Sequence, residues 1–169
     1  MSVDFTTARL RVRSFKEADR GAMEKLLTDR EIAKTYMLPD LESVEAVDRL
    51  FARFRELSVK EGRYVAGIYL DKELVGFMND VENDGNRIEL GYVIARDRWG
   101  KGYATEMLRG AIADLFRRGY EEVVAGAFEE NKASVRVMEK AGMEKIALEE
   151  EIDYRGMSHH CVYYSVKKA

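Results

Sequence analysis

Arg-Asp-Arg-Trp-Gly-Lys-Gly-Tyr-Ala-Thr, residues 96–105, is the stretch that decides the fold of this chain. An apolar run at 90–94 precedes it and is typical of a buried strand. Residues 105–116 follow it and repeat apolar side chains every three or four positions, which indicates a helix. The stretch is therefore predicted to be a glycine-containing turn that links a strand to a helix.

A turn of this kind is suited to holding phosphate groups. Gly100 and Gly102 allow the backbone to come close to a ligand, and the first turn of the helix offers free amides at the positive end of its dipole. The pattern is not a nucleoside-triphosphate P-loop, and it is not a dinucleotide fingerprint, whose third glycine would fall on Thr105. Judged alone, the turn is equally compatible with a tight connection that binds nothing.

The composition predicts a single globular domain over residues 1–169. Apolar residues make up 46% of the chain and charged residues 35%, with a net charge of −3. This charge disfavours a nucleic-acid partner, which normally needs a basic surplus. No apolar run is long enough to span a membrane, and we see no signal segment. Cys161 is the only cysteine, so no internal disulfide forms and we expect a cytoplasmic location.

The remaining pattern predicts an α/β fold whose mixed sheet has about seven strands, mostly antiparallel and flanked by helices. The predicted strands are 9–13, 64–70, 73–78, 87–94, 122–127, 143–154 and 161–166. A helix separates 87–94 from 122–127, so these two strands are expected to be the one parallel pair. Asn131 is predicted to cap the next helix and Gly142 to end it.

Three segments together resemble the GNAT superfamily of acyl-CoA-dependent N-acyltransferases, and within it the RimJ/RimL-like branch of ribosomal-protein N-acetyltransferases. They are Thr7-x-Arg9-Leu10-x-x-Arg13 with Asp19, residues 89–94 with 99–106, and residues 131–143. The three occur in the order found in that branch and on the expected elements. Any one of them alone would be a weak signal.

The resemblance implies that acetyl-CoA is the co-substrate, with no metal. In the family, the strand that ends near Val93 and Ile94 splays from its parallel neighbour and offers backbone groups to the pantetheine arm. The pyrophosphate would be held by backbone amides of Trp99, Gly100, Lys101, Gly102, Tyr103, Ala104 and Thr105. Asn131 and Ser134 would reach the pantetheine or the thioester. Trp99 stands where the family's pattern has Gln or Arg.

Transfer to an amine requires an unprotonated amine and a proton for the leaving thiolate. Glu89 is the candidate base, directly or through water, on the same strand face as Gly91 and Val93. The alternative is a carboxylate that is solvated or paired with an arginine such as Arg87. Ser134 is the candidate acid, because Met138 replaces a tyrosine that many relatives carry; the alternative is a serine that only bonds the backbone or the cofactor.

The acceptor is expected to be a primary amine, on a peptide N-terminus or a small molecule, attacked in a ternary complex. Monomer and homodimer are both open, and no nucleic-acid or membrane partner is expected. The alternative function is a non-catalytic acyl-CoA-binding module or sensor, which Met138 favours, and a further one is an unrelated phosphate-binding protein. His159 and His160 are adjacent on a strand and point to opposite faces, so they cannot readily share a metal ion.

Overall fold

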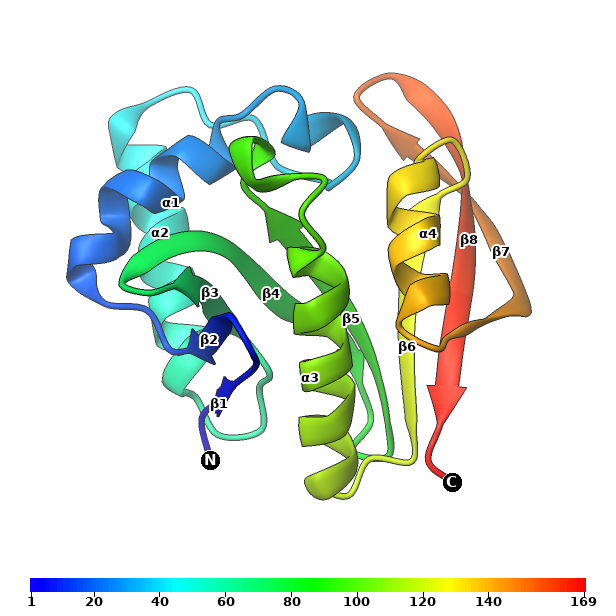
Figure 1. Ribbon diagram of the computed structural model, residues 1–169. Helices are drawn as coiled ribbons and strands as arrows, with labels where there is room; N and C mark the ends of the chain where they lie inside the picture. Colours follow the sequence, from blue (N-terminus) through cyan, green and yellow to red (C-terminus); the bar gives the residue numbers. More distant parts are fainter.

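Eight strands form one mixed sheet flanked by four α-helices in the computed structural model, which describes residues 1–169 (Figure 1). The strands are β1 (Asp4–Thr6), β2 (Leu10–Arg13), β3 (Ala66–Leu70), β4 (Glu73–Asn83), β5 (Arg87–Ile94), β6 (Glu122–Phe128), β7 (Glu144–Tyr154) and β8 (Met157–Lys167). The helices are α1 (Arg20–Leu27), α2 (Val44–Val59), α3 (Tyr103–Arg117) and α4 (Lys132–Lys140). The strand order is β1-β2-β3-β4-β5-β6-β8-β7, and only β5 and β6 run parallel.

The sequence predicts about seven strands, and the structure has eight. The additional strand, β1, has only three residues, which is too short to show an alternating pattern, and it pairs with β2. β3 begins at Ala66, two residues later than predicted. The amide of the preceding Tyr64 donates to the Asp80 carboxylate at 3.2 Å and not to a neighbouring strand. The central parallel pair and the antiparallel pairing of β7 with β8 are confirmed.

The helices cover both faces of the sheet (Figure 1). On one face, Met107 and Leu108 of α3 and Met138 of α4 belong to the same buried cluster as Leu90 of β5. On the other face, the cluster that contains Val93 also contains residues of α1 and α2. β5 therefore turns alternate side chains toward two different layers, as a strand buried on both faces must. None of the helices is long and apolar enough to cross a membrane.

The parallel strands β5 and β6 separate partway along their length. Their pairing runs from Arg87 opposite Glu122 to Leu90 opposite Ala125 and stops there. β5 nevertheless stays paired with β4 as far as Ile94, and β6 stays paired with β8 as far as Phe128. The facing edges of β5 at 91–94 and of β6 at 126–128 are thus not paired with each other. This is the splay that the family resemblance implies.

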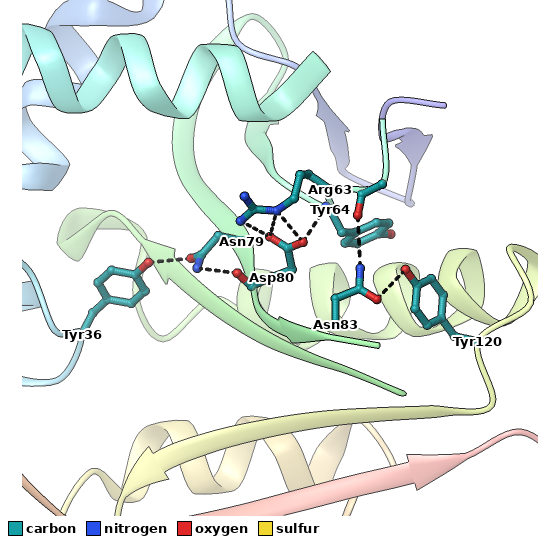
Figure 2. Close-up of polar contacts among 8 residues, drawn as sticks. Tyr36, Arg63, Tyr64, Asn79, Asp80, Asn83 and Tyr120 are labelled. Atoms are coloured by element: carbon teal, nitrogen blue, oxygen red, sulfur yellow. Dashed lines mark hydrogen bonds and ion pairs between the residues drawn. The ribbon is translucent and has the colours of Figure 1, made fainter. Parts of the chain in front are cut away.

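A polar network ties β4 to the segments beside it (Figure 2). The Arg63 guanidinium donates to both carboxylate oxygens of Asp80, at 2.8 and 2.9 Å, and the Asp80 side chain is only 3% exposed. The neighbouring Asn79 accepts a hydrogen bond from the Tyr36 hydroxyl. Because a buried carboxylate is stable only when its charge is paired, Arg63 is required for this part of the sheet.

Replacing Asp80 with alanine is expected to lower the free energy of unfolding by about 2–3 kcal/mol, since it removes the partner of a partly buried arginine and the acceptor for the Tyr64 amide. Urea denaturation measures this loss. The matched control is Asp4→Ala, which breaks an ion pair with Arg11 whose side chains are 57% and 52% exposed. That change is expected to cost less than about 1 kcal/mol. Equal losses in the two variants would contradict the argument.

Candidate active site

A cavity of about 520 Å³ opens beside the splay. Its walls come from the end of β5, the 96–105 turn, helix α4 and the segment at 31–36. The predicted cofactor residues that line it are Val93, Ile94, Trp99, Gly100, Gly102, Tyr103, Ala104, Thr105, Asn131 and Ser134. Lys101 does not line it, because its ammonium group points to the carbonyl of Asp97 at 3.4 Å. The structure thus brings two segments that are about thirty residues apart to the same cavity.

The turn before α3 presents a row of unbonded backbone amides. Gly100 and Gly102 have φ angles of +76° and +82°, a conformation that other residues rarely adopt. The backbone N–H groups of residues 100–105 donate to no other group of the protein. Three of them belong to the first turn of α3, whose dipole adds positive potential. This geometry fits a diphosphate, which offers oxygen acceptors and negative charge.

Trp99 holds the turn in place but does not offer its own amide. Its backbone N–H is bonded to the Arg96 carbonyl at 3.2 Å, so the free amides begin at Gly100 and not at Trp99. The indole Nε1 donates to the Ile94 carbonyl at 2.7 Å. The side chain thereby links the end of β5 to the start of the free amides. This contact gives a physical reason for a tryptophan at this position.

Helix α4 forms the opposite wall of the cavity. The Asn131 side chain accepts a hydrogen bond from the Ser134 amide at 3.2 Å, which confirms Asn131 as the N-cap. Ser134 lies beside Tyr92; burial raises the pKa of Tyr92, and hydrogen bonding with Ser134 opposes this only in part. Tyr92 therefore keeps its proton at neutral pH. Met138 is fully buried in the core, so its side chain has no access to the cavity.

Glu89 lies on β5 just before the two parallel strands separate. It does not line the cavity, yet it shares its strand face with Gly91 and with Val93, which does. Burial, followed by the charges of Glu82 and Glu150, raises its pKa to about 7, and Arg87 opposes the shift. Arg87 is paired instead with Glu122 at 3.2 Å, and Glu89 has no ion pair. A carboxylate of this kind can exchange a proton near neutral pH.

Several residues that line the cavity were not predicted from the sequence. The most informative is Tyr36, whose ring edge lies near Gly91 and whose hydroxyl is fixed by Asn79 (Figure 2). Tyr36 lies in an irregular segment where no periodicity indicated which side chains point inward. The others are Glu31, Ile32, Lys34, Thr35, Tyr92, Arg98, Ala133, Arg136, Val137 and Lys140.

His159 and His160 have separate environments. His159 stacks on Phe128 with ring centroids 4.2 Å apart and contacts Glu130 at 2.6 Å. His160 contacts two carboxylates of β7, which raise its pKa. Tyr154 donates its hydroxyl proton to the Ala33 carbonyl at 2.6 Å, so it ties β7 to the segment after α1.

The turn, the splay and the cavity between them have the shape and the free backbone groups that suit an extended, diphosphate-containing ligand. The chain belongs to the GNAT acetyltransferase family, because the family model "Acetyltransferase (GNAT) domain" matches residues 9–144. It is an acetyltransferase. It is 27% identical to the uncharacterized N-acetyltransferase YoaA of Bacillus subtilis, over 96% of this chain and 95% of that protein.

Two solved structures show the same fold. RimL, a ribosomal L7/L12 alpha-N-protein acetyltransferase in complex with coenzyme A, superposes with a TM-score of 0.83 at 18% identity, over 95% of each chain. Spermidine N-acetyltransferase of Vibrio cholerae, in complex with CoA and spermine, superposes with a TM-score of 0.80 at 19% identity, over 95% of this chain and 96% of that one. The GNAT resemblance and the fold it implies are therefore confirmed.

Proposed function

We propose that this protein, as a single domain over residues 1–169, transfers an acetyl group from acetyl-CoA to a primary amine by direct attack in a ternary complex. One observation carries the proposal. The unbonded amides of residues 100–105 and the strand edges left free by the splay border one continuous cavity. The first feature suits a diphosphate and the second suits an amide-containing arm. Acetyl-CoA combines both groups in a single molecule.

When bound, acetyl-CoA supplies a thioester carbonyl that an amine can attack. The residues of this chain then have four tasks. The amides from Gly100 to Thr105 hold the diphosphate, and the edges of β5 and β6 orient the arm. Glu89 accepts, through water, the proton that the attacking amine loses as its C–N bond forms. Ser134, which is hydrogen-bonded with the protonated Tyr92, donates a proton to the thiolate that leaves as the C–S bond breaks.

The acceptor is proposed to enter through a second hollow, of about 1130 Å³, between the segment after α1 and the β7–β8 hairpin. It adjoins the first cavity, because both are lined by Lys34, Thr35, Asn131 and Ala133. Its rim carries both acidic and basic side chains, so charge alone does not select one acceptor. A peptide N-terminus and a small amine are the two classes we propose, since the RimL and spermidine enzymes, which share the fold, act on one of each.

The experiment that tests this function is a CoA-release assay. Purified protein is incubated with acetyl-CoA and a panel of N-terminal peptides, polyamines and amino sugars, and free thiol is measured with and without each acceptor. We expect release to depend on at least one amine, with mass spectrometry showing one acetyl group added. Tight CoA binding with no transfer to any amine would contradict an enzyme and favour the acyl-CoA-binding sensor.

The role of Trp99 gives a more specific prediction. Trp99→Phe keeps an aromatic ring but loses the indole hydrogen bond to Ile94, so the turn is less well ordered before binding. We expect the KM for acetyl-CoA to rise by about 3- to 10-fold, the worth of one hydrogen bond, with little change in kcat. Tyr120→Phe is the matched control, because it removes a hydroxyl that is bonded to Asn83 (Figure 2) and neither residue lines the cavity. A fall in kcat with unchanged KM would contradict this role.

A further inference from the structure

Tyr163 of β8 lies beside the point where β5 and β6 separate. It is opposite Gly126 of β6, the first residue beyond the pairing of β6 with β5. A Cβ added to Gly126 would lie 2.7 Å from the Tyr163 ring, so the ring occupies the space that a side chain at 126 would need. Tyr163 is only 6% exposed. The glycine therefore allows this tyrosine to lie against the backbone of β6 at the start of the splay.

The hydroxyl of Tyr163 holds the side chain of Glu150 in place. It donates a hydrogen bond to the Glu150 carboxylate at 2.7 Å. The neighbouring Glu149 and Glu151 both pair with His160. Glu150 itself is exposed on β7 and forms no ion pair, so without Tyr163 its long side chain would be free to turn its charge into solvent. The bond thus fixes an unneutralised carboxylate in one position.

Glu150 and Glu89 project from the same face of the sheet. Glu150 lies opposite Cys161, which shares a face of β8 with Tyr163. Val124 of β6 belongs to the same buried cluster as Cys161 and Tyr163, and it lies opposite Glu89 on β5. The side chains of β6 and β8 between the two carboxylates are therefore apolar and buried, which leaves their mutual repulsion only weakly screened.

The electrostatic surroundings of Glu89 agree with this arrangement. The titratable groups that act on it or respond to its charge are Glu82 on β4, Glu150 on β7, Tyr163 and Cys161 on β8, and Arg87 on its own strand. Burial and the charges of Glu82 and Glu150 raise the pKa of Glu89 to about 7, and Arg87 opposes them. Burial, followed by the bond to Glu150, raises the pKa of Tyr163, so this tyrosine keeps its proton at neutral pH and remains a donor.

We propose that Tyr163 is a positioning residue for the acetyl transfer, because it holds the charge of Glu150 on the sheet face that carries Glu89. The inference rests on the proposed function, in which Glu89 accepts the proton of the attacking amine. A fixed negative charge nearby makes Glu89 hold that proton more strongly, so the carboxylate is a stronger base. Tyr163 lines neither the cofactor cavity nor the acceptor hollow, so it acts through Glu150.

The test follows the Glu89 carboxyl group by ¹³C NMR as the pH is raised, so it needs neither acetyl-CoA nor an acceptor. The signal of Glu89 is the one that is missing from Glu89→Gln. At pH 6 we expect the deprotonated fraction of Glu89 to be about 2- to 5-fold larger in Glu150→Gln than in the unmodified protein, because the repelling charge is gone. Tyr163→Phe should raise it by about 2-fold, because Glu150 keeps its charge but loses its fixed position. With an accepted amine, kcat at pH 6 relative to its value at high pH should rise by the same factors.

Two matched controls separate this effect from a general disturbance of the sheet. Tyr164→Phe removes the hydroxyl of the next residue of β8, which packs on the other face, and Glu151→Gln removes the next charge of β7. Neither should alter the titration of Glu89 or the pH dependence of kcat. An unchanged Glu89 titration in Tyr163→Phe or Glu150→Gln, or a changed titration that kcat does not follow, would overturn the inference and leave acetyl transfer intact. If the unmodified protein acetylated no amine, the proposed function would fail and the inference with it.

Discussion

Replacing Glu89 with glutamine is expected to lower kcat by about 100-fold or more, with a much smaller change in the KM for acetyl-CoA. The substitution keeps the size of the side chain and removes its ability to accept a proton, and a positioned general base typically contributes a factor of this order. Glu89 lies outside the cofactor cavity, so binding of acetyl-CoA is not expected to depend on its charge. Initial rates at saturating acceptor measure the effect.

The pH dependence of the rate provides an independent test of the same role. Burial and the charges of Glu82 and Glu150 raise the pKa of Glu89 to about 7. A base works only when deprotonated, so kcat should rise with pH through about 7 and level off above it. In Glu89→Gln this rise of kcat near pH 7 should disappear, and only the pH dependence caused by titration of the acceptor amine should remain. If kcat of the variant still rose with pH through about 7, another group would have to accept the proton.

A stability measurement separates chemistry from folding. The pKa of Glu89 is higher in the folded protein than its ordinary value of 4.5, so the fold favours the protonated form. The contribution of Glu89 to stability is therefore complete below about pH 4.5 and is lost as the pH rises through 7. At pH 8, Glu89→Gln should be at least as stable as the unmodified protein. Glu144→Gln, the same change at an exposed position of β7, is the control and should alter neither rate nor stability.

Local patterns in the sequence were sufficient to predict the elements that border the cavity, namely the turn before α3, the cap of α4 and the parallel pair of strands. The glycine turn and the Asn131 cap are each set by residues that are neighbours in the chain, and the parallel pair follows from the helix between its two strands. The resemblance then related these elements to one cofactor. Trp99 shows a limit of such patterns, since its amide was expected to be free and is bonded to the Arg96 carbonyl.

The rest of the site depends on residues that are distant in the sequence. Tyr36 reaches Gly91 from an irregular segment, and no periodicity marks its direction. The raised pKa of Glu89 depends partly on Glu150, which lies on a strand near the other end of the chain. Arg9 and Lys140, which are far apart in the sequence, line the same polar cavity beside the start of α3. Contacts of this kind depend on the tertiary fold, and no pattern within a short stretch of sequence predicts them.

The second large effect is expected at Ala104, in the first turn of α3. Ala104→Asp should weaken acetyl-CoA binding by about 100-fold or more, because it places a carboxylate among the amides that hold the diphosphate. Unit charges of the same sign about 4 Å apart repel by roughly 4 kcal/mol near a protein surface. The same carboxylate lies at the positive end of the helix dipole, where acidic residues stabilise a helix. Binding should therefore fall while the melting temperature stays the same or rises.

Opposite effects on binding and stability are what make this variant informative, because damage to the fold would lower both. Ala104→Asn is the matched control, because asparagine has nearly the same shape as aspartate but carries no charge. We expect its loss of affinity to be at least about 10-fold smaller than that of Ala104→Asp. Calorimetric titration with coenzyme A and thermal melting in the absence of ligand measure the two quantities. If Ala104→Asp bound coenzyme A as tightly as Ala104→Asn, the free amides of residues 100–105 could not be the diphosphate site. The main structural support for the proposed acetyl transfer, the unbonded amides of residues 100–105, would then be removed.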